Sequence, residues 1–116
     1  MRRGLFVLLL LYAVPVAAYQ YIGFEQLTVD NTSGGVRFDV NKISPPGPDA
    51  TTAICRLETG QIRYQIDGKT AVTTTVGTLW EIGEEKQFNG HDVLLNFRAI
   101  RTGGTSGQLS CTYSSP

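Results

Sequence analysis

His91 is where acid–base or nucleophilic chemistry would have to start, because it is the only histidine in the chain. A Ser-His-Asp triad needs an imidazole that takes a proton from a serine hydroxyl. His91 follows Asn89-Gly90 and precedes Asp92, and this run of turn formers predicts a solvated surface turn. No pair of carboxylates is placed to work with it as acid and base, so we predict that the protein is not an enzyme.

Cys55 and Cys111 are the only cysteines. The absence of a CxxC motif and of a second histidine excludes a zinc knuckle, and we expect neither a metal nor another cofactor. In an exported chain the two cysteines would be a natural disulfide pair, worth up to about 4 kcal/mol. In a reducing compartment they would be two small buried hydrophobic residues. The sequence leaves both alternatives open.

Arginine and aromatic residues form the third candidate group, because both are enriched at protein interfaces. Cross-strand pairing of the arginines with Glu58 and Asp67 is the alternative role, and the sequence leaves it equally open. The candidate interface residues are Arg56, Arg63, Tyr64, Trp80, Arg98, Arg101 and Tyr113.

The elements that must position these residues are strands, because period-two alternation of apolar and polar residues recurs along the chain. One segment, for example, places Val36, Phe38 and Val40 on one face and polar residues on the other. The predicted strands are 21–29, 35–43, 51–58, 61–67, 78–83, 93–101 and 108–113.

Turn residues set the expected connections between these strands. Thr59-Gly60 predicts either a two-residue hairpin or a bulge within one strand. Residues 83–90 read as a turn, and the Gly-rich corner at 102–107 predicts a hairpin of the last two strands. The pattern indicates an all-β fold, a single β-sandwich or jelly-roll-like domain of about seven to eight antiparallel strands over residues 19–116.

An apolar leader, residues 1–18, precedes this domain. Arg2 and Arg3 stand before an apolar run, and Val16-Ala17-Ala18 supplies the small residues of a signal-peptidase site, so cleavage is expected between Ala18 and Tyr19. A membrane span would need about 20 apolar residues, more than this run contains. A buried or interface arm and a start codon placed too early are the alternatives.

The charges of the chain balance, with 10 basic and 10 acidic residues. A nucleic-acid binder would normally carry a basic surplus or stripe, and none is visible. We therefore expect neither a nucleic-acid partner nor a small-molecule substrate.

A set of strand and turn residues is shared with one known group of proteins. In this chain the matching residues are Glu58-Thr59, Ile62-Arg63-Tyr64, Asp67-Gly68, Gly77, Phe97-Arg98-Ala99-Ile100, the closing run 109–113 and the opening strand 21–29. With these residues the chain resembles small β-rich virion structural proteins of tailed bacteriophages. It departs from their pattern at Lys69-Thr70-Ala71, where Pro-Thr is usual, and in its leader.

The resemblance implies a virion component, either a capsid decoration (cement) protein or a head or tail accessory. Such a protein would self-associate as a dimer or trimer and bind other virion proteins, such as the major capsid or tail proteins, and the resemblance implies no catalytic residues. The alternative interpretation is an exported, secreted or periplasmic, disulfide-stapled module that recognises carbohydrate or a surface protein.

Overall fold

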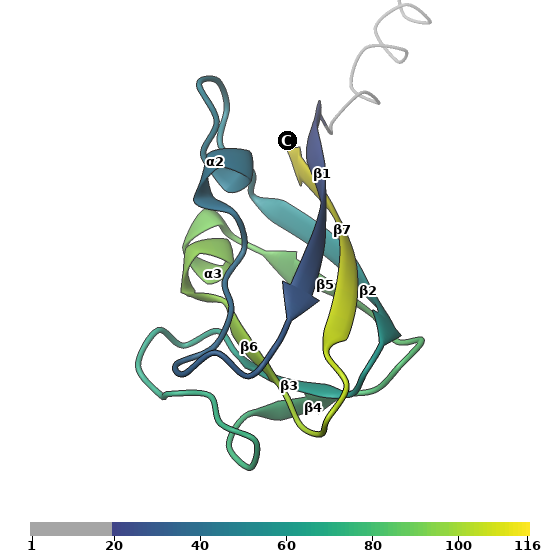
Figure 1. Cartoon of the computed structure of the whole chain (residues 1–116). Coiled ribbons are helices and arrows are strands. Elements are labelled where there is room, and N and C mark those ends of the chain that lie inside the picture. The colour runs from purple at the N-terminus through teal and green to yellow at the C-terminus, as the bar shows by residue number, and fades with distance from the viewer. Residues whose placement is uncertain (1–19) are drawn as a thin grey trace, which may run out of the picture.

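Residues 20–116 are described by the structure, a computed structural model, and the predicted leader lies outside these described residues. Seven strands form two antiparallel sheets, and two short helices lie beside them (Figure 1). The prediction of an all-β, sandwich-like fold of about seven to eight antiparallel strands is confirmed, with seven strands in two sheets.

Four strands form sheet A, in the order β1-β7-β2-β5. Inward positions along β2 and β7 are buried, and most outward positions are exposed or half-buried, which is the alternation that the sequence showed. The strands are β1 (Gln20–Val29), β2 (Thr52–Thr59), β5 (Glu85–Asn89) and β7 (Gly107–Ser115).

Three short strands form sheet B, in the order β4-β3-β6. Figure 1 shows β3 and β4 crossing near the lower end of sheet A, while the helices α2 and α3 lie together on one side of it. The elements are α2 (Val40–Ile43), β3 (Ile62–Gln65), β4 (Thr78–Trp80), α3 (His91–Asn96) and β6 (Arg98–Arg101).

Aromatic rings fill the core between these layers. Phe38 stacks on Phe97 with ring centroids 4.1 Å apart, and Tyr64 meets Trp80 edge to face at 5.5 Å. Such pairs contribute about 0.5–1.5 kcal/mol beyond the burial of their area. The aromatic residues of the cluster are Phe38, Tyr64, Trp80, Phe88, Phe97 and Tyr113.

The predicted strand over 35–43 is wrong. Val36 makes a single bridge to Ala99, and the chain then turns into α2. Asp39 caps this helix, because its side chain accepts a hydrogen bond from the backbone N–H of Asn41 at 2.9 Å. The alternation ends where this cap begins, and Val40 is exposed while Ile43 is buried.

The predicted hairpin of the last two strands is also wrong. Residues 91–96 form α3, and the strand that follows, β6, belongs to sheet B while β7 belongs to sheet A. The predicted turn over 83–90 contains β5, whose Phe88 is buried in the core. Glu84 and Glu85 made this segment look solvated, although alternate residues of β5 face the core.

The Thr59-Gly60 connection forms neither a hairpin nor a bulge within one strand. β2 and β3 lie in different sheets, and Gly60 makes the corner between them with a φ of 66°. A Cβ atom there would lie 2.5 Å from the carbonyl oxygen of Ser106, so only glycine fits. The chain therefore passes from one layer to the other within two residues.

Candidate binding surface

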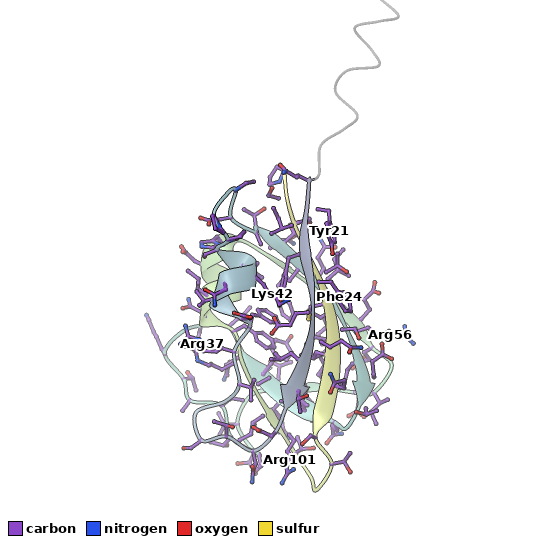
Figure 2. All side chains as sticks on the ribbon, turned by 45° about the horizontal axis from the view of Figure 1, so that its top comes forward. Tyr21, Phe24, Arg37, Lys42, Arg56 and Arg101 are labelled. Carbon is purple, nitrogen blue, oxygen red and sulfur yellow. A yellow bond between two sulfur atoms is a disulfide. The ribbon has the colours of Figure 1, made fainter. Side chains whose placement is uncertain are left out.

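The outward face of sheet A is the most distinctive surface of the described chain. Phe24, Thr112 and Ile54 lie in one row across β1, β7 and β2, and Tyr21 pairs with Ser114 in the next row. Tyr21, Phe24 and Ile54 are exposed by 66%, 46% and 40%. We call this surface, centred on these three side chains, the A face (Figure 2).

A β-bulge places both aromatic rings on the A face. Tyr21 pairs with Ser114 and Gly23 pairs with Tyr113, so Ile22 is the extra residue of β1. Residues three apart in a regular strand point to opposite sides. The bulge at Ile22 is therefore what brings Tyr21 and Phe24 to one side, and the sequence pattern did not reveal it.

Polar, mostly uncharged side chains surround these apolar groups. Arg56 and Glu85 face each other across β2 and β5. The other outward positions paired in the sheet carry hydroxyl or amide side chains: Gln26, Thr28, Thr52, Gln87, Asn89, Gln108, Ser110, Thr112 and Ser114. Apolar side chains within a weakly charged polar surround are the composition of an interface core.

A disulfide lies on the opposite, inward side of the same sheet. Cys55 and Cys111 are paired in register on β2 and β7, with Cα atoms 4.1 Å apart, and they are bonded. Both are fully buried. The bond joins the two central strands of sheet A and so fixes the strands that carry Ile54 and Thr112 relative to each other.

Two of the predicted interface residues are buried in the core instead. Trp80 is fully buried and donates its ring N–H to the carbonyl oxygen of Glu84 at 3.0 Å. Tyr113 is also fully buried, with its hydroxyl donating to Glu25 at 2.6 Å, and burial together with this carboxylate raises its pKa. Because both side chains are buried, their large apolar area stabilises the fold and is not available for a surface contact.

Three of the four predicted arginines have internal bonds. Arg63 donates to the carbonyl oxygens of Thr74 and Gly77 at 3.1 and 2.8 Å. Arg98 donates to backbone carbonyls and Arg101 to the hydroxyl of Ser106. Figure 2 shows Arg56 and Arg101 on different sides of the molecule, so the candidate residues do not form one cluster.

Tyr64 joins the aromatic core, half-buried beside Trp80 and Phe88. Of the seven candidate interface residues only Arg56 lies exposed on the A face. The aromatic residues that are exposed there, Tyr21 and Phe24, were missed. Their signal was their place at the start of a strand whose outward positions are otherwise polar.

His91 is not a solvated turn residue. It begins α3, is half-buried, and its Nδ1 lies 2.9 Å from the carbonyl oxygen of Ala50. Its Nε2 lies 3.2 Å from the hydroxyl oxygen of Ser44 and 3.6 Å from a carboxylate oxygen of Asp49. Serine and carboxylate share one ring nitrogen, whereas a triad needs them on opposite nitrogens. The ring instead holds the proline-rich loop against α3.

Within residues 20–116 no three His, Cys, Asp or Glu side chains gather as metal ligands. The same part of the chain contains no helix long and apolar enough to cross a membrane. Comparison with protein-family models, with curated proteins and with solved structures gives no match.

Proposed function

We propose that this protein is a non-enzymatic virion structural component of a tailed phage, which decorates or stabilises the particle as a cement protein or a head or tail accessory. The A face is the observation that carries the proposal. It exposes two aromatic side chains and one isoleucine on a polar, weakly charged sheet. Exposed apolar groups with a polar rim are typical of protein contact sites.

The residues of the family resemblance support the proposal because they build the scaffold. Asp67 accepts hydrogen bonds from the N–H groups of Lys69 and Thr70 and so shapes the turn after β3. Arg63 holds the carbonyl oxygen of Gly77, a residue with a φ of 131°. A family whose shared residues fix strands and turns is suited to presenting a surface rather than to catalysis.

Assembly would use the A face more readily than the edge of sheet A. The ammonium group of Lys42 in α2 donates to the carbonyl oxygen of Phe24 at 3.2 Å, so α2 occupies part of the free edge of β1. A contact of standard size covers about 800 Å² on each partner. We propose that the A face binds a second and third copy, or a major capsid or tail protein.

The decisive experiment is cryo-electron microscopy of the particles from the source, with residues 20–116 fitted into the head and tail density. The expected result is density for this sandwich at a fixed lattice position, with Tyr21, Phe24 and Ile54 at the contact. Its absence from all head and tail density would disprove the virion role.

A variant pair separates the A face from exposed hydrophobic residues in general. Phe24→Ser with Ile54→Ser is expected to abolish self-association in analytical ultracentrifugation. The matched control, Leu79→Ser with Ile82→Ser, removes two exposed apolar groups elsewhere and should assemble normally. Equal loss in both variants would show that the A face is not the contact.

A second function is supported by the disulfide. A buried Cys55–Cys111 bond suits an oxidising compartment and therefore an exported binding module that recognises carbohydrate or a surface protein. The mass of the native chain distinguishes the two proposals. A chain beginning at Tyr19 and two protons lighter than its reduced form supports export, whereas retention of residues 1–18 supports the virion component.

A further inference from the structure

A small pocket opens between the β3–β4 connection, the end of α3 and the start of β6. Its volume is about 180 Å³, and its walls include Gln65, Lys69, Asn96 and Arg98. Sites for drug-sized ligands usually measure roughly 300–1,000 Å³. The pocket therefore suits a ligand of only a few heavy atoms.

Arg98 is a half-buried cation in this wall without an internal counter-ion. Its Nη1 donates to the carbonyl oxygens of Leu95 and Phe97 at 3.1 and 2.8 Å, which fixes the guanidinium in place. No carboxylate within residues 20–116 lies within 4.0 Å of an arginine or lysine nitrogen, and the one basic–acidic contact at that distance is His91 with Asp49, elsewhere in the fold. Burial, and then the nearby charge of Arg37, lower the pKa of Arg98. A half-buried cation without a counter-ion can accept an anion from outside the chain.

Three other polar side chains of the wall have no internal hydrogen-bond partner, whereas the hydroxyl of Thr70, which also lines the pocket, donates to Asp67 at 2.7 Å. No hydrogen bond between described residues involves the side chain of Gln65, Lys69 or Asn96. The carboxylate nearest in sequence, Asp67, is taken up by the N–H groups of Lys69 and Thr70 at 2.9 and 3.0 Å, and it does not line the pocket. The residues that line the pocket thus include two cations and two amides but no carboxylate.

We propose that this pocket is a binding site for a small oxyanion, namely a carboxylate or phosphate group. A guanidinium presents two parallel N–H groups that match either anion, and charge-assisted bonds of this kind are roughly twice as strong as neutral ones. Lys69 supplies a second positive charge, and the amides of Gln65 and Asn96 supply further donors. The site lies apart from the A face, and it stands whether or not the A face mediates assembly.

NMR titration of the ¹⁵N-labelled full chain tests the site. Sodium phosphate and sodium acetate are added separately at constant ionic strength, and sodium chloride is the reference salt. The expected result is saturable shift changes centred on Gln65, Lys69, Asn96 and Arg98. Tighter binding of acetate would assign a carboxylate ligand, and tighter binding of phosphate a phosphate group.

Variants then identify the groups that bind. Arg98→Gln is expected to weaken binding by about tenfold or more, and Lys69→Gln to weaken it several-fold. Arg56→Gln removes an exposed arginine from the A face and should leave binding unchanged. Because Arg98→Gln also loses two bonds to the backbone, Lys69→Gln decides the matter if the first variant fails to fold.

The proposal is overturned if neither salt produces saturable changes at these residues, or if chloride reproduces them. It is equally overturned if Lys69→Gln binds as tightly as the unchanged chain.

Discussion

Each of the two sheets has one face that points away from the core, and the two outward faces differ in how far their apolar side chains are exposed. On sheet A the outward side chains of Tyr21, Phe24 and Ile54 are exposed. On sheet B the outward residues are Arg63, Leu79 and Ile100, and Ile100 is only 7% exposed. Within residues 20–116 the A face has no cover, whereas the outer face of sheet B is covered over Ile100 but not over Leu79, which is 39% exposed.

The cover of sheet B is the connection between β3 and β4. Val72 in this connection is 2% exposed, yet neither Val72 nor Ile100 belongs to the main core. The guanidinium of Arg63 holds the connection down through Thr74 and Gly77. The covered face of sheet B contributes to stability, and the exposed aromatic groups of the A face are the basis of the contact site proposed above.

Removal of the disulfide should have the largest effect, because the bond joins the two central strands of sheet A. We expect Cys55→Ala with Cys111→Ala to lower the free energy of unfolding by about 4 kcal/mol, the loop-entropy contribution for a separation of 56 residues. This loss is measured by urea unfolding, followed through the fluorescence of Trp80, the single tryptophan of the chain, which is fully buried. A change below about 1 kcal/mol would mean that strand pairing alone fixes sheet A.

Release of the β3–β4 connection from sheet B should have the second largest effect on the free energy of unfolding. Arg63→Met removes two charge-assisted hydrogen bonds from a half-exposed site, and we expect a loss of about 2 kcal/mol and protease cleavage within residues 66–77. Arg56→Met is the matched control on the A face, with an expected change within about 0.5 kcal/mol. Equal effects of the two substitutions would remove the difference between the faces.

Truncation of one apolar side chain at each outer face should give a smaller difference in the free energy of unfolding. Val72→Ala removes buried methyl groups beneath the cover and should cost about 1–2 kcal/mol. Tyr21→Ala, at a side chain that is 66% exposed, should stay within about 0.5 kcal/mol. Urea unfolding followed by Trp80 fluorescence measures both, and a Tyr21 cost as large as that of Val72 would show that the A face supports the fold.

The smallest expected effect is a pH dependence at the start of the cover. The N–H groups of Lys69 and Thr70, followed by the Thr70 hydroxyl, lower the pKa of Asp67 from 3.8 to about 2. Because this folded pKa lies below the unfolded one, its contribution to stability is present above pH 3.8 and is lost as the pH falls toward 2. A carboxyl ¹³C titration with a midpoint near the ordinary value would show that the turn does not hold the carboxylate.

Three of the four strands of sheet A were predictable because alternate burial is a local, period-two property. Residues 51–58 and 108–113 were assigned correctly, since their inward residues are apolar and their outward residues polar. The helices α2 and α3 were missed because they are 4 and 6 residues long, too short for a helical period to appear. β5 was missed because charged residues at its start resembled a turn.

The candidate surface was less predictable than the fold. Arginine and aromatic residues were chosen by type, but Trp80 and Tyr113 fill the core and Arg63 holds a loop. Residue type does not report which face of a sheet is covered. The exposure of Tyr21 and Phe24 depends on a bulge and on the fact that no element within residues 20–116 covers these side chains.

By itself the sequence determined where β1, β2 and β7 form, because backbone preference and alternation act over a few residues. Tertiary structure alone decided that β2 and β3 part at Gly60 into different sheets, that Cys55 meets Cys111, and which face stays bare. Those outcomes depend on contacts between residues far apart in the chain. A short-range pattern shows which residues share a face of a strand, but it does not show which other segments pack against that face.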